Sequence, residues 1–350
     1  MNQSYPAWLK GTVILFGLVL IFVILSYGKF IMMPLAFAAL IAMLLEPVSQ
    51  WLERLKLNRV VSIVVSMILL FIVLGGIISL LSIQLVQFAD RLPEANQKIQ
   101  AISSDLLQFF EAKFNLSPSR QVEFLEQGLS TVVNEGGKYL SSALGATTSV
   151  FATLGLLPIF VFFMMYYKNM YRTFLHKLWK GDGETINNVI DGIQSVTQNY
   201  IIGMMTVITL LAILNAIGLW IIGIEHALFF AVFASILAII PYIGIVIGSL
   251  PAIIFALLFT ESLLIPLGVI AVFATVQFLE GNFITPNVLG SRVSINPMVA
   301  LVALLVGGEL WGISGMILVV PFIGILKHIF DQIEALRPFG YLFGNSQEYS

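Results

Sequence analysis

The polar residues best suited to chemistry in this sequence gather in one short insert, residues 277–287, between two apolar runs. The insert combines a carboxylate, amides and a hydroxyl with two helix breakers: Gln277, Glu280, Gly281, Asn282, Thr285 and Pro286. If the flanking runs cross a membrane, a charge among them costs at least about 2.5–3.5 kcal/mol, so it should face a cavity, a partner or a pathway. A broken helix there would also expose backbone groups that can bind a solute. We therefore interpret the insert as a candidate substrate or ion pathway; the alternative is that residues 280–297 form an ordinary polar loop at the membrane surface.

Three further polar residues lie in or near apolar sequence: Asn215, Arg292 and Glu309. Arg292 would keep a neighbouring carboxylate ionised. Glu309 follows two glycines, so it is either functional or a helix-start residue that stabilises exposed amides. Asn215 is more typical of an interhelical hydrogen bond than of a ligand site.

The sequence contains no complete motif for enzyme, metal or cofactor chemistry. The sequence has no cysteine, and His176, His226 and His328 show no metal-ligand spacing. Residues 136–138 lack the upstream glycine and the following Ser or Thr of a phosphate-binding loop. Ser314 sits in a motif like that of intramembrane serine proteases, but His328 would lie about 21 Å away along the same helix. We predict no catalytic residue, no metal and no cofactor.

Composition defines the elements that must position these residues. The chain has 350 residues, 59% hydrophobic and 10% charged, whereas soluble domains are roughly a quarter charged. Several uncharged stretches exceed the roughly 20 residues that span a bilayer as a helix. The fold class is therefore all-α, a polytopic integral membrane protein with about seven or eight transmembrane helices. Its 17 basic residues are dispersed and its net charge is -2, which excludes a nucleic-acid partner and leaves the lipid bilayer.

The chain divides into three predicted regions. Residues 1–89 should form an N-terminal transmembrane hairpin and a third span, with Glu46-Pro47 ending the second span. Residues 90–138 are polar but keep helical spacing of apolar residues, which predicts an extramembrane amphipathic helical module. Residues 139–350 should form the C-terminal transmembrane transport region.

Turn residues interrupt the apolar segments of this C-terminal region. The uncharged stretch 227–260 carries Pro-Tyr-Ile-Gly in its middle, and the pieces on either side are short for full spans. We therefore predict broken or re-entrant helices. The residues that would act as hinges or breaks are Pro241, Tyr242, Gly244, Gly281 and Gly312.

Basic residues predict the orientation. Lys168, Arg172, Lys177 and Lys180 form the densest short basic cluster, which the positive-inside rule assigns to the cytoplasm. This arrangement places the N- and C-termini in the cytoplasm and residues 90–138 outside.

The combined motif pattern resembles the autoinducer-2 exporter (AI-2E) transporter family over nearly the whole chain. The residues that carry the resemblance are Pro241-Tyr242-Ile243-Gly244, Pro251, Glu280-Gly281-Asn282, Thr285-Pro286, Gly290, Asn296-Pro297, Gly308, Leu310-Trp311-Gly312, Gly315 and Pro321. The resemblance implies a multi-pass protein of the bacterial cytoplasmic (inner) membrane that has no ATPase and forms a homo-oligomer, for instance a pentamer. It also implies export of the quorum-sensing molecule autoinducer-2 or, in some members, sodium/proton exchange.

Three functions stay open on these residues. Autoinducer-2 is small, neutral and rich in hydroxyls, so it needs amide and hydroxyl partners such as Gln277, Asn282 and Thr285. Exchange of Na⁺ for H⁺ needs a carboxylate that titrates in a dehydrated site, for which Glu280 and Glu309 are the candidates. The third function is that of a non-transporting membrane scaffold whose external module binds another protein.

Overall fold

The described chain is helical almost throughout. The computed structural model describes residues 6–114, 155–179, 181–240, 243–260, 262, 264–289 and 295–344. Within these ranges the only extended pairing is an isolated bridge between Ile295 and Gly344. The predicted all-α class is confirmed. Residues 115–138 of the predicted amphipathic module, together with Pro241, Tyr242 and Arg292, lie outside the described residues.

Among the described residues, six helical segments are long and apolar enough to cross a membrane. They are α1 (Ala7–Tyr27), α2 (Lys29–Arg54), the first part of α3 (Arg59–Phe114), α7 (Gly183–Ile222), α10 (Leu264–Leu279) with its continuation to Val288, and α13 (Ile313–Gln332). Four shorter apolar helices accompany them: α5 (Leu156–Tyr166), α8 (Ala227–Leu237), α9 (Ile243–Phe259) and α12 (Pro297–Trp311). Many large apolar side chains on these helices are exposed, as expected where lipid is the solvent. The chain is a polytopic membrane protein.

The chain packs into two compact units. Unit 1 comprises Met1–Ile68, Thr153–Met204 and Asn287–Ser350, and unit 2 comprises Leu69–Ala152 and Met205–Pro286.

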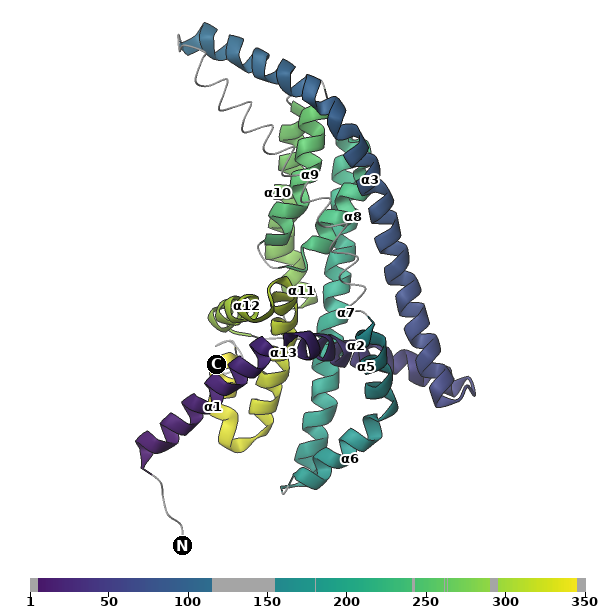
Figure 1. The fold of residues 1–350 in the computed structure, drawn as a ribbon, viewed down its shortest axis with the longest axis vertical. Helices are drawn as coiled ribbons and strands as arrows, with labels where there is room; N and C mark the ends of the chain where they lie inside the picture. Colours follow the sequence, from purple (N-terminus) through teal and green to yellow (C-terminus); the bar gives the residue numbers. More distant parts are fainter. Residues whose placement is uncertain are drawn as a thin grey trace. The chain divides into compact units, whose positions relative to one another are not determined.

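In unit 1, α12 and α13 form a tight hairpin (Figure 1). The turn is at Gly312, whose φ of 61° favours glycine. A Cβ on Gly315 would lie 1.8 Å from the carbonyl oxygen of Gly307, so the hairpin requires a bare backbone at that crossing. Asn296 caps α12 by accepting from the Met298 amide at 2.9 Å, and Pro297 occupies the first helical turn.

The N-terminal helices of unit 1 differ from the predicted hairpin. The Gly28 amide donates to the Ile24 carbonyl at 2.8 Å, and the Met32 amide donates to the Gly28 carbonyl at 2.9 Å. Helical hydrogen bonding therefore persists on both sides of the glycine. As a result α1 leads into α2 through a bend and does not fold back along it (Figure 1).

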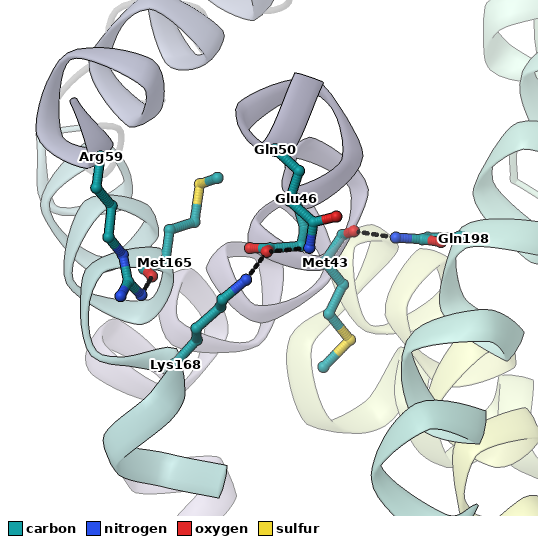
Figure 2. A network of polar contacts seen from close by, with 7 residues as sticks. All are labelled: Met43, Glu46, Gln50, Arg59, Met165, Lys168 and Gln198. Atoms are coloured by element: carbon teal, nitrogen blue, oxygen red, sulfur yellow. Dashed lines mark hydrogen bonds and ion pairs between the residues drawn. The ribbon is translucent and has the colours of Figure 1, made fainter. Parts of the chain in front are cut away.

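The prediction that Glu46-Pro47 ends the second span is wrong, because α2 continues through Pro47 to Arg54. Proline has no amide hydrogen, so the carbonyl four residues earlier, that of Met43, loses its helical donor. The side chain of Gln198 on α7 replaces this donor, with Nε2 2.8 Å from the Met43 oxygen (Figure 2). A partner from another helix thus allows the proline inside α2.

Unit 2 contains the predicted break between residues 227 and 260. Helix α8 ends at Leu237, α9 begins at Ile243, and the two pack against each other. A Cβ on Gly244 would lie 1.7 Å from the Leu237 carbonyl oxygen, so glycine permits the close approach. The core between these helices, α7 and α10 contains Leu219, Phe230, Phe255 and Val269.

Candidate functional site

The polar insert contains a π-helical segment within the apolar helical run Leu264–Val288. Helix α10 ends at Leu279, η1 (Glu280–Ile284) follows with π-helical bonding, and α11 (Thr285–Val288) completes the run. The Thr285 amide donates to the Glu280 carbonyl, five residues back. Gly281 is a weak helix former and Pro286 lacks an amide hydrogen, so regular α-helical bonding fails here. Residues 277–288 are therefore helical, not a loop or a complete break, and π-helical turns of this kind are frequent at functional sites.

Glu280 is the centre of this segment. Its Oε2 accepts a hydrogen bond from Gln277 Nε2 at 2.8 Å, and its Oε1 accepts one from the Thr285 hydroxyl. The helix thus brings together three of the predicted site residues, with the carboxylate only partly buried. The cluster can accept hydrogen bonds from hydroxyl groups through the carboxylate and the threonine oxygen.

The remaining residues of the insert border this cluster. Asn282 is exposed, and its Nδ2 donates to the Phe278 carbonyl at 2.8 Å. Gly281 and Pro286 are exposed as well, and a Cβ on Gly281 would meet no atom within 4 Å. Asn282 thus presents an exposed amide two residues along the helix from the partly buried carboxylate of Glu280.

Two predicted residues lie elsewhere. Asn215 is fully buried on α7 and forms an interhelical hydrogen bond, with Nδ2 3.3 Å from the Ser235 hydroxyl on α8. Its Oδ1 has no hydrogen-bond partner among the described residues. Glu309 is exposed near the C-terminal end of α12. The helix-start interpretation of Glu309 is wrong, because α12 runs unbroken through the two preceding glycines.

Sequence reasoning missed a polar network in unit 1 around Glu46 (Figure 2). Glu46 is 8% exposed on α2, where its carboxylate forms an ion pair with Lys168 and accepts from Gln50 Nε2 at 2.8 Å. Lys168 begins the helix α6 (Lys168–Leu178). Burial and, secondarily, the charge of Arg172 lower the pKa of the Lys168 ammonium. The signal in the sequence was a lone carboxylate at the end of a long apolar run.

Arg59 extends this network to the start of α3. Its guanidinium donates to the Met165 carbonyl at 2.9 Å and lies 5.9 Å from the centre of the Tyr166 ring. The last turn of α5 is therefore held by a cation as well as by packing.

The cavities differ in chemistry from the Glu280 cluster. Unit 1 has a cavity of about 420 Å³ whose walls come from α1, α2, α5, α12 and α13 and are apolar. Trp311 lines it, but its indole N–H is already used to donate to the Leu25 carbonyl at 2.9 Å. Such a cavity suits an apolar group and not a hydroxyl-rich solute. Unit 2 has a cavity of about 380 Å³ that includes Gln84 and His226.

No group of three or more His, Asp or Glu side chains that could hold a metal ion occurs among the described residues.

Comparison with known proteins agrees with the resemblance found in the motifs. Residues 12–335 match the family model described as "AI-2E family transporter". The chain is 28% identical to "Putative transport protein YrrI" of Bacillus subtilis, over 85% of both chains. It is 29% identical to "Putative transport protein YueF" of the same organism, over 87% of this chain and 84% of the relative. It is also 26% identical to "Putative transport protein YhhT" of Escherichia coli K12, over 85% and 83%.

Proposed function

This chain belongs to the AI-2E family of transporters, and on that basis we propose that it exports a small polar solute along a path that includes the π-helical segment Glu280–Ile284. The observation that carries the proposal is the carboxylate of Glu280, held by Gln277 and Thr285 within an apolar span. An ionisable side chain at such a place is costly to maintain without a function.

The chemistry of the segment favours a neutral, hydroxyl-rich solute such as autoinducer-2. A hydroxyl group of the solute can donate to the carboxylate, and its oxygen can accept from an amide of Gln277 or Asn282. Exchange of these bonds for the internal ones would let the solute bind without leaving buried polar groups unpaired.

Sodium/proton exchange through the same carboxylate is the second candidate function. The observation in its favour is that the two hydrogen bonds to Glu280 come from neutral groups, an amide and a hydroxyl. A carboxylate held by neutral donors can release them to bind Na⁺ or H⁺.

The setting we propose is the cytoplasmic membrane of a bacterium, with both termini in the cytoplasm and residues 90–138 outside. The homologues come from bacteria, and the basic cluster at Lys168, Arg172 and Lys177 supports this orientation. We also propose a homo-oligomer, such as a pentamer, as the assembled form.

Transport by the purified protein in liposomes tests the proposal. Labelled autoinducer-2 would be followed into and out of proteoliposomes, with and without Na⁺ and pH gradients, against protein-free liposomes. Movement above the protein-free rate without a gradient supports facilitated export, and movement that follows a gradient supports ion coupling. Gradient-driven Na⁺ or H⁺ flux without autoinducer-2 movement would favour exchange. No flux of any of these would contradict transport of these substrates and favour the scaffold.

A further inference from the structure

Helix α6 separates its residues into two faces. At about 100° per residue, the apolar residues lie on one side of the helix: Met170, Tyr171, Phe174, Leu175 and Leu178. The opposite side carries the polar and basic residues: Lys168, Asn169, Arg172, Thr173, His176 and Lys177. No acidic residue occurs in the helix.

The polar face of α6 is fixed to α7. Arg172 donates to Asp191 at 2.8 Å and to Asn187 at 3.3 Å. His176 Nε2 lies 3.0 Å from the same Asn187 oxygen. These contacts determine the rotation of α6 about its own axis, so its apolar face must point away from α7.

That apolar face is uncovered. Phe174 is 59% exposed, Met170 is 56% exposed and Leu178 is 65% exposed. None of the residues of α6, all of which the structure describes, is buried. Removing this face from water would stabilise the protein by about 25 cal/mol of free energy for each Å² of apolar surface.

The position of α6 in the chain identifies what covers the face. The apolar helix α5 ends in aromatic side chains, with Phe162 stacked on Tyr166 and Phe163 stacked on Tyr167, as is typical where a helix leaves the hydrocarbon region. Helix α6 begins at the next residue, Lys168, so it starts at the depth of the lipid headgroups.

From this geometry we propose that α6 lies in the membrane–water interface, with its apolar face among the lipid acyl chains. Lys177, next to that face on the helix surface, extends to anionic phospholipid headgroups. Lys168 pairs with Glu46 and Arg172 pairs with Asp191, so Lys177 is the basic residue of the helix that complements the negative surface of an anionic leaflet. The helix is thereby a lipid-contact surface that fixes how deeply unit 1 sits in the bilayer.

Spin labels on single cysteines test this proposal, since the chain has no cysteine of its own. The labels would be placed in Phe174→Cys and Thr173→Cys, neighbours on opposite faces that are both exposed. The protein would be reconstituted in phosphatidylcholine vesicles with and without phosphatidylglycerol. Collision rates with oxygen, which concentrates in lipid, and with a water-soluble nickel chelate would be measured.

We expect the oxygen-to-nickel collision ratio to be severalfold higher at position 174 than at position 173. We also expect phosphatidylglycerol to deepen the label at 174, and Lys177→Gln to reduce that response. Leu178→Cys provides a second lipid-facing site if Phe174→Cys folds poorly. High nickel access at 174 and 178 would overturn the proposal by placing the face in water. Protection of both positions from both reagents would overturn it in favour of a protein partner.

Discussion

The carboxylate of Glu280 accepts two hydrogen bonds, from Gln277 and Thr285, and a substitution there would remove this charged acceptor. Glu280→Gln keeps the size of the side chain but abolishes the charged acceptor, and a hydrogen bond to a charged group contributes about 1.5–3 kcal/mol. We therefore expect the rate of solute movement in proteoliposomes to fall by about tenfold or more. Glu309→Gln is the matched control, since it changes an exposed carboxylate in another apolar helix, and should change the rate less than twofold. Equal effects of the two variants would contradict the assignment of Glu280 to the path.

The ion pair between the buried Glu46 and the partly exposed Lys168 is expected to stabilise unit 1 only while both partners are present. Either Glu46→Gln or Lys168→Met alone leaves a desolvated partner without its counter-charge, which should cost roughly 1–3 kcal/mol after allowance for the partial exposure of Lys168. The double variant should recover part of this loss. Unfolding of the detergent-solubilised protein, measured as a double-mutant cycle, checks the coupling. Strictly additive losses would show that the two side chains do not interact.

Residue types are visible in the sequence, but their partners are not. The insert around Glu280 could be predicted because its members lie within eleven positions of each other. The role of Glu46 could not, because its partner lies 122 residues later in the chain. Glu309 shows the converse, because the two glycines before it suggested a helix start where the helix in fact continues.

At the scale of elements, the α12–α13 hairpin depends on the backbone contact between Gly307 and Gly315. Gly315→Ala should force the helices apart and cost about 1–3 kcal/mol, as for overpacked cores. Gly17→Ala on α1 is the control, because a Cβ there meets no atom within 4 Å, and it should raise helix stability by up to about 1 kcal/mol. Thermal unfolding of the two variants in the same detergent provides the measurement. A Gly315→Ala protein as stable as wild type would refute the close contact.

Hydropathy predicts that helices exist more reliably than where they end. The helix end predicted at Glu46-Pro47 was wrong because Gln198, far away in the sequence, donates to the Met43 carbonyl that Pro47 leaves without a helical donor. The glycine and proline in the insert around Glu280 predict a helix break. In the structure the backbone changes to π-helical hydrogen bonding there, and the helical run continues as one candidate span. The break between α8 and α9 was predictable because short apolar pieces flank a turn-forming sequence.

At the scale of the whole molecule, composition and packing group the chain differently. Composition marks changes at residues 89 and 138, whereas packing joins Met1–Ile68 with Thr153–Met204 and Asn287–Ser350. Contacts between segments this far apart leave no mark in local composition. The apolar content alone predicts a membrane protein, because no soluble fold can bury so much apolar surface.

The most direct test of a solute path through the π-helical segment is substrate protection of a cysteine at Asn282. Purified Asn282→Cys in proteoliposomes would be treated with a water-soluble maleimide, with and without saturating autoinducer-2. Leu15→Cys, an exposed apolar position on α1, serves as the lipid-facing control. We predict that Asn282→Cys reacts, that autoinducer-2 slows the reaction, and that Leu15→Cys stays unlabelled. No reaction at position 282, or the same rate with and without autoinducer-2, would contradict a path for this solute.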